Sequence, residues 1–132
     1  MKVFVSKTFP AEHGALLSQR GYEVEFGSDF AKARGADAIL TFLTDRIDKR
    51  IMESIGSQLK IIGNCAVGVD NIDLAAAREK GILVTNTPNV LTEAVAEHAV
   101  AITLGIARHV VQADAFIRQG KYKGWEMSLF LG

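Results

Sequence analysis

This sequence is poor in cysteine and proline, has no excess of either charge, and lacks any pair of glycines spaced G-x-G. Its single cysteine, Cys65, excludes an internal disulfide and a multi-cysteine metal site, as expected in a reducing compartment. Fifteen basic residues balance fifteen acidic ones without a basic cluster. We therefore expect no nucleic-acid partner, because binding to a phosphate backbone relies on many Lys and Arg contacts. The longest uncharged apolar run, residues 99–107, is about half of a membrane span, so no membrane partner is expected either.

Several motifs of known chemistry are also missing. The chain has no dinucleotide fingerprint G-x-G-x-x-G, no P-loop, no G-x-S-x-G elbow and no H-E-x-x-H helix. These 132 residues contain no recognisable nucleotide cradle, so we expect no cofactor to bind them tightly. Met1 leads directly into an apolar strand pattern without the charged and apolar regions of a signal peptide, which predicts a cytoplasmic location.

The patterns that are present describe an α/β domain. Short apolar runs typical of strands alternate with patterns typical of short helices. The strands are expected at 2–5, 22–26, 38–41, from 60 onward and at 82–84. The period-two alternation at 22–26 predicts a strand at the sheet edge. Such an order predicts a parallel five-stranded sheet with helices on both faces, joined by right-handed crossovers.

A change of character follows residues 85–89. From Thr92, a residue type suited to the N-cap, to Gln119 the pattern predicts one continuous helix that ends at Gly120, about 42 Å long. Such a helix must project from a small domain. Its middle, 99–107, is apolar nearly all round, which predicts burial on more than one side, against a second domain or a second subunit. The apolar tail at 121–132 indicates an interface.

The turn at 66–71, between the fourth strand and a helix capped by Asp73, is the best candidate for chemistry. Gly68 would permit backbone angles closed to other residues and a close ligand approach, so adjacent N–H groups could converge on an anion. An ordinary tight connection explains the same residues equally well. Asp70 and Asn71 are expected to shape the turn through side-chain hydrogen bonds to the backbone.

Other candidates have structural explanations. Neighbouring helical residues point about 100° apart, so Glu97 and His98 diverge, and we expect them to be partly buried structural groups. Cys65 has no evident base and is expected to serve packing. A receiver domain of similar topology would need acidic residues at the ends of the first and third strands, where Ser6 and Phe42 stand.

A series of motifs in fixed order resembles one family. G-V-D-N-I-D at 68–73, V-T-N-T-P at 84–88 and A-E-H at 96–98 are similar to the N-terminal part of the D-isomer-specific 2-hydroxyacid dehydrogenases. The likeness is strongest to the glyoxylate/hydroxypyruvate reductase and phosphoglycerate dehydrogenase branches. T-F-L-T-D-R-I-D at 41–48 and the ending W-E-M-S-L-F-L-G resemble the glyoxylate reductase branch, so the match covers essentially the whole chain.

The resemblance implies a flavodoxin-like fold and a division of the chain. Residues 1–88 would form the N-terminal part of the substrate-binding domain, and 89–132 a long interdomain helix and tail, with homodimerisation through 92–131. The nucleotide-binding domain would be absent. By the same resemblance, backbone N–H groups of Val67 and Gly68 would hold the substrate carboxylate. Leu43 and Thr44 would border its pocket, and Thr92 would touch the nicotinamide side of the cofactor.

The resemblance also sets an expectation about activity. The complete enzyme would use NAD or NADP to reduce a small 2-oxo acid such as glyoxylate or hydroxypyruvate to the 2-hydroxy acid. The family's catalytic Arg, Glu and His have no counterpart in these residues, so the isolated chain is expected to be inactive. The alternative is a non-catalytic dimerisation or interaction module built on the same domain.

Overall fold

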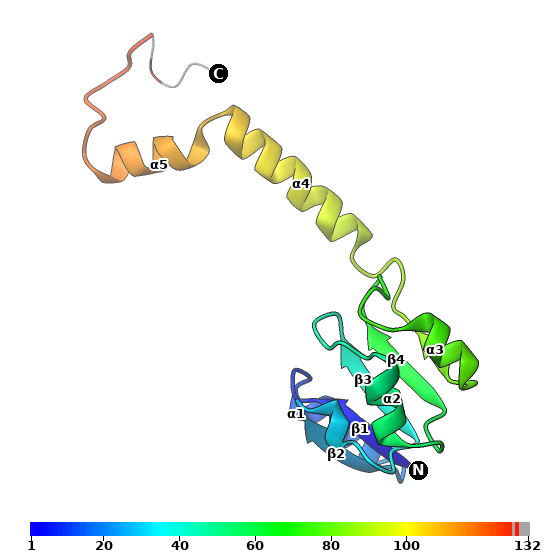
Figure 1. The fold of residues 1–132 in the computed structure, drawn as a ribbon. Coiled ribbons are helices and arrows are strands. Elements are labelled where there is room, and N and C mark those ends of the chain that lie inside the picture. The colour runs from blue at the N-terminus through cyan, green and yellow to red at the C-terminus, as the bar shows by residue number, and fades with distance from the viewer. Residues whose placement is uncertain (128, 130–132) are drawn as a thin grey trace. The chain divides into compact units, whose positions relative to one another are not determined.

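Five parallel strands form one sheet in the order β2-β1-β3-β4-β5 in the computed structural model, which describes residues 1–127 and 129 (Figure 1). The strands are β1 (Lys2–Ser6), β2 (Glu23–Gly27), β3 (Ala38–Phe42), β4 (Ile61–Cys65) and β5 (Leu83–Thr85). The helices that join them are α1 (Ala11–Ser18), the 3₁₀ turn η1 (Phe30–Lys32), α2 (Lys49–Ile55) and α3 (Leu74–Glu79). The predicted parallel sheet is confirmed, and β2 lies at its edge as the alternation indicated.

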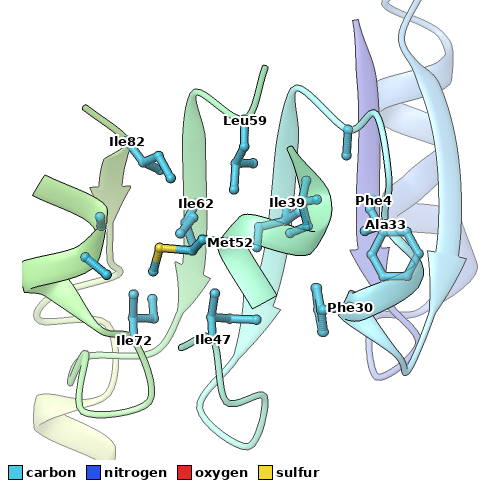
Figure 2. Packing of buried hydrophobic residues seen from close by; sticks show 14 residues of the cluster. Phe4, Phe30, Ala33, Ile39, Ile47, Met52, Leu59, Ile62, Ile72 and Ile82 are labelled. Carbon is cyan, nitrogen blue, oxygen red and sulfur yellow. The ribbon is translucent and has the colours of Figure 1, made fainter. Parts of the chain in front are cut away.

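Successive strand residues point to opposite sides of the sheet, so both faces carry apolar side chains. Helices cover both faces, with one core cluster on each. On one face, Phe4, Ile39 and Ile62 belong to the main core beneath α2, α3 and η1. Figure 2 shows Met52 of α2 among these side chains, and Met52 is buried. On the other face, Val3 and Val5 pack with Leu17 of α1 and its neighbours in a smaller cluster.

Aspartates begin the short helices that return the chain to the sheet. The Asp48 side chain accepts a hydrogen bond from the Ile51 N–H at 3.0 Å, and Asp73 accepts one from the Ala76 N–H at 2.9 Å. Each bond satisfies one N–H group that a helix start leaves without a partner. The predicted N-cap role of Asp73 is confirmed, and both caps place a helix directly after a loop at the carboxyl edge of the sheet.

Ion pairs link α2 to the end of α3 on the main core face, and the shorter one joins Lys49 to Glu79. Lys49 Nζ of α2 lies 2.9 Å from Glu79 Oε2 of α3. The hydrogen bond and the charge of Glu79 raise the pKa of Lys49, and those of Lys49 lower the pKa of Glu79. Both groups are exposed, so solvent screens the pair and its effect on stability is small.

The chain divides into two compact units, Met1–Asn89 and Val90–Gly132. The second contains α4 (Thr92–Ala107) and α5 (Val110–Arg118). The continuous helix predicted over 92–119 is wrong, because His109 adopts the left-handed conformation (φ 52°) and separates the two helices. A left-handed residue is a common way to end a helix, and His enters that region more readily than most side chains.

The start of α4 also differs from the prediction. Leu91 occupies the N-cap position, Thr92 is the first helical residue, and no side chain caps the helix. In the described part of the chain, no single helix meets the length and hydropathy expected of a membrane span; α4 and α5 together, bent by 60°, meet them by length and composition only.

The packing of β2 against the core can be tested at Gly27. A Cβ atom there would overlap the Phe4 ring, which is 2% exposed and makes an edge-to-face contact with Phe30, with 5.2 Å between ring centroids. Because Phe4 has no room to move, Gly27→Ala is expected to lower the free energy of unfolding by about 1–3 kcal/mol in urea denaturation. Gly68→Ala is the matched control, since its added Cβ meets only the end of the exposed Asp70 side chain. Equal stability of the two variants would contradict this description of the core.

Candidate functional site

Three loops meet at the carboxyl edge of the sheet: 43–47 after β3, 66–72 after β4 and 86–89 after β5. In an open parallel sheet this is the edge at which ligands bind. The loops are held together by hydrogen bonds between residues far apart in the sequence, and these bonds define the geometry of the site.

A pair of asparagine side chains, one buried and one half-buried, connects the first two loops. Asn64, on β4, donates from Nδ2 to the Asn71 Oδ1 at 3.1 Å, and Asn71 donates back from Nδ2 to the Asn64 Oδ1 at 3.2 Å. Thr41, the register partner of Asn64 on β3, donates its hydroxyl to the same Asn64 oxygen at 2.9 Å. Asn64 is only 2% exposed, so these bonds supply partners for polar atoms that water cannot reach.

Asn71 fastens the loop after β3 to the loop after β4. Its Nδ2 lies 3.0 Å from both the Phe42 and Asp45 carbonyl oxygens, which accept from it. Its backbone carbonyl accepts from the Ile47 N–H at 2.8 Å, in a bridge between Ile47 and Ile72. The prediction that Asn71 shapes the turn through its side chain is confirmed. No hydrogen bond from Asp70 is found in the described part of the chain.

The turn after β4 presents backbone N–H groups without acceptors. Within the described residues, neither Val67 nor Gly68 donates its N–H to another group, and Val67 is 53% exposed. The first three carbonyls of this turn are engaged: Ala66 accepts from the Thr87 N–H, Val67 from Asn86 Nδ2 and Gly68 from Asn64 Nδ2, each at 2.9 Å. A turn with free donors and occupied acceptors is suited to an anion.

One predicted reason for Gly68 is wrong. Its φ is not among the positive values found at six other glycines, so its backbone conformation is open to any residue. The second reason agrees with the geometry, because only the Asp70 carboxylate, 3.3 Å away, would lie near an added Cβ. Gly68 therefore leaves space next to its N–H, and the carboxylate of Asp70 places a negative charge beside that space.

Leu43 and Thr44 line a different hollow from the one that Val67 and Gly68 border. A cavity of about 440 Å³ lies between the loops after β3 and β4, bounded by Leu43, Thr44, Arg46, Ile47, Asp48 and Asp70–Asp73. Neither Val67 nor Gly68 is part of its lining. The structure thus brings the two predicted pairs onto adjacent loops, tied by Asn71, but not into one cavity.

Thr92 belongs to the second unit, at the first position of α4. Glu97 and His98 lie on the same helix, and both are exposed rather than partly buried as predicted. The prediction of partial burial is wrong, because the described part of the chain buries no residue of that helix. No group of three or more His, Cys, Asp or Glu side chains suited to a metal was found in the same part.

Cys65 lies at the end of β4, beside a smaller hollow. The hollow, of about 260 Å³, is lined by Phe9, Leu40, Gly63, Asn64, Cys65 and Thr85–Thr87. Cys65 is half-buried there, and no histidine lines the same hollow. The lining combines apolar side chains with those of Asn64 and 85–87, and the packing role of this thiol stays a prediction.

Three residues of the site were not singled out from the sequence: Thr41, Asn64 and Asn86. For Thr41 and Asn64 the sequence contains a pattern that could have identified them. Each is the one polar residue in the inner part of an otherwise apolar strand, near its carboxyl end. In adjacent parallel strands such residues can become register partners, and here they do. Asn86 carried no such signal, because a polar residue after a strand is the ordinary composition of a loop.

Comparison with known proteins identifies relatives over nearly the whole chain. The family described as D-isomer specific 2-hydroxyacid dehydrogenase, catalytic domain, matches residues 3–122. A glyoxylate reductase of Thermococcus litoralis is 43% identical over 144 aligned positions, which cover 99% of this chain and 43% of the relative. The chain therefore spans less than half the length of this curated relative.

Solved structures give the same result. The TT0316 protein from Thermus thermophilus matches with a TM-score of 0.88 at 41% identity, covering 100% of this chain and 45% of that one. A Polaromonas protein described as an NAD-binding D-isomer specific 2-hydroxyacid dehydrogenase matches with a TM-score of 0.83 at 34% identity, covering 99% and 44%. The five-stranded sheet and its helices are thus an arrangement found in larger dehydrogenase chains.

The polar connection between the loops can be tested at Thr41. Thr41→Val keeps the shape of the side chain and removes the hydroxyl that donates to Asn64. The buried Oδ1 of Asn64 then has one hydrogen-bond donor fewer. We expect the free energy of unfolding to fall by about 1–2 kcal/mol in urea denaturation. The control is Thr85→Val, at an exposed position, where a change within about 0.5 kcal/mol is expected. Equal stability of the two variants would show that the buried bond contributes nothing.

Proposed function

Since the chain belongs to the D-isomer-specific 2-hydroxyacid dehydrogenase family, we propose that it is the N-terminal substrate-domain segment of an NAD(P)-dependent dehydrogenase. In the complete enzyme the substrate is a small 2-oxo acid, such as glyoxylate or hydroxypyruvate, which is reduced to the 2-hydroxy acid. The similarity to a glyoxylate reductase over 99% of the chain supports this substrate class.

The observation that carries the proposal is the pair of N–H groups at Val67 and Gly68, which have no acceptor among the described residues. They lie after β4, at the ligand-binding edge of a parallel sheet, with space beside Gly68 for a ligand. A carboxylate is an acceptor that two adjacent N–H groups can share. In the proposed enzyme these groups hold the substrate carboxylate, Leu43 and Thr44 on the adjacent loop border the substrate, and Thr92 contacts the nicotinamide side of the cofactor.

The chain itself has the parts for substrate binding and not those for reduction. A nicotinamide cofactor, when bound, supplies the hydride, but these 132 residues contain no glycine-rich cradle that fits a dinucleotide. The N–H groups at Val67 and Gly68 bind and orient a carboxylate, and they have no means of moving a proton. We therefore propose that this chain is inactive alone and binds neither NAD nor NADP tightly.

The proposal is tested by an activity assay in two forms. The purified chain is expected to show no oxidation of NADH or NADPH with glyoxylate above background. A chimera in which it replaces the matching segment of the Thermococcus litoralis glyoxylate reductase is expected to be active. Gly68→Ala in that chimera is expected to raise KM for glyoxylate about three- to tenfold, because the methyl group occupies the space beside the N–H.

Two results would contradict the proposal. Turnover by the isolated chain would show that it holds groups for hydride transfer that its sequence does not reveal. A folded chimera that binds cofactor and does not reduce glyoxylate, or whose KM is unchanged by Gly68→Ala, would count against the assignment of the substrate site. Circular dichroism and cofactor binding establish whether the chimera has folded.

The second unit favours an additional role as a dimerisation module. Many of its apolar side chains are exposed to solvent, and Ile102 and Ile106 are 48% and 71% exposed. None of the residues of α4 or α5 is buried. An apolar groove of about 410 Å³ lies between the two helices, with Ile102, Ile106 and Val110 in its lining. An exposed apolar surface of this kind is typical of an interface. We propose that a second copy of the chain covers it. Ser128, Phe130 and Leu131 of the predicted dimerisation segment lie outside the described residues.

Light scattering tests the dimer. The chain is expected to have twice the mass of one copy, and Ile102→Asp with Ile106→Asp is expected to give a monomer, since a charge in an apolar interface loses its hydration. Gln119→Glu adds a single negative charge at the end of α5 and is expected to leave the mass unchanged. A monomeric wild-type chain, or a dimer that survives both aspartates, would reject this surface as the interface.

A further inference from the structure

The turn after β4 is held by its carbonyl groups rather than by its N–H groups. The carbonyls of Ala66 and Val67 both accept from the segment that follows β5, the first from the Thr87 N–H and the second from the Asn86 side chain. Two adjacent peptide groups of the turn are thereby fixed to one neighbouring loop.

These bonds determine where the N–H groups point. A peptide group is planar and trans, so its carbonyl and the N–H of the next residue point in opposite directions. The bond from Thr87 to the Ala66 carbonyl therefore turns the Val67 N–H away from the loop after β5. The bond from Asn86 to the Val67 carbonyl does the same for the Gly68 N–H. Each N–H group that is proposed to bind a carboxylate is thus oriented by one hydrogen bond, which the carbonyl of the same peptide group accepts on the opposite side.

Of the two donors, only the Asn86 amide belongs to a side chain. Asn86 is exposed, its Nδ2 lies 2.9 Å from the Val67 carbonyl, and it is not part of either hydrophobic core cluster. Asn64 donates to the carbonyl of Gly68, the next residue in the turn. Unlike Asn86, it is buried, and it also fastens the loop after β3 through Asn71. A change at Asn86 can therefore alter the orientation of one peptide group without disturbing the core.

We infer that Asn86 is a positioning residue, which holds the Val67–Gly68 peptide group with the Gly68 N–H directed toward a small carboxylate. The inference rests on the proposed function, because it concerns the same anion site. The side-chain amide competes with solvent for the Val67 carbonyl and favours one orientation of the peptide group before the ligand arrives. Pre-orientation of this kind lowers the cost of ordering a loop on binding.

The test is a titration of the ¹⁵N-labelled chain with glycolate, followed through the amide signals of Val67 and Gly68. In the wild-type chain both signals are expected to shift and saturate. In Asn86→Ala the apparent Kd for glycolate is expected to rise about fivefold, the amount that one lost hydrogen bond gives. The midpoint of thermal unfolding is expected to stay unchanged. Asn86→Gln, which keeps the amide donor on a longer side chain, is expected to recover part of the affinity.

The matched control is Thr85→Ala, an exposed position one residue away with no hydrogen bond from its hydroxyl in the described part of the chain. If wild-type Val67 and Gly68 do not respond to glycolate, the proposed carboxylate site and this inference both fail. If the wild type responds and Asn86→Ala binds equally well, the inference alone fails. If Asn86→Ala loses binding in step with thermal stability and Asn86→Gln recovers neither, Asn86 is a structural residue and the positioning role is rejected.

Discussion

The amide pair of the buried Asn64 and the half-buried Asn71 is the interaction on which the carboxyl edge of the sheet depends. Two primary amides that exchange hydrogen bonds still have atoms free for further partners, and here those partners are the Thr41 hydroxyl and carbonyls from both loops. A group such as Asn64, with almost no exposure, must find all its partners within the protein, which leaves little freedom in how the loops lie. The geometry of the turn at 66–71 is a consequence of that requirement.

This arrangement is suited to binding a carboxylate and not to transferring a hydride or a proton. The turn places free N–H groups at the edge where ligands bind, while every carbonyl from 66 to 68 is occupied by the protein's own donors. Such a turn can orient a carboxylate, but reduction also needs a hydride and a proton. The relatives that this chain matches are more than twice as long as the segment it covers, which agrees with the proposal that residues of another segment complete the site.

The predictions that failed share one cause, which is the effect of surroundings on a local pattern. The pattern over 92–119 is helical, and even Gly105, a residue type that disfavours a helix interior, lies inside an unbroken α4. The break occurs instead at His109, whose left-handed conformation no periodicity signals. Similarly, Gly68 seemed to need unusual backbone angles, whereas its value to the site is the empty space where a side chain would be. Glu97 and His98 were expected to be partly buried structural groups, but burial depends on what covers a helix and not on the helix itself.

The sequence alone determined the strands, the short helices, the cap at Asp73 and the position of the turn, because each depends on residues within one or two turns of backbone. It also placed Asn71 correctly as a residue that shapes the turn. Only the tertiary structure decided which distant groups meet: Thr41 with Asn64, Asn71 with the Phe42 carbonyl, and Asn86 with the Val67 carbonyl, pairs separated by 23, 29 and 19 positions. Strand register and loop packing bring these pairs together, and no local pattern contains that information. The orientation of the Val67 and Gly68 N–H groups belongs to this second category, whereas the candidate role of the turn was already predicted from the sequence and its resemblance to the family.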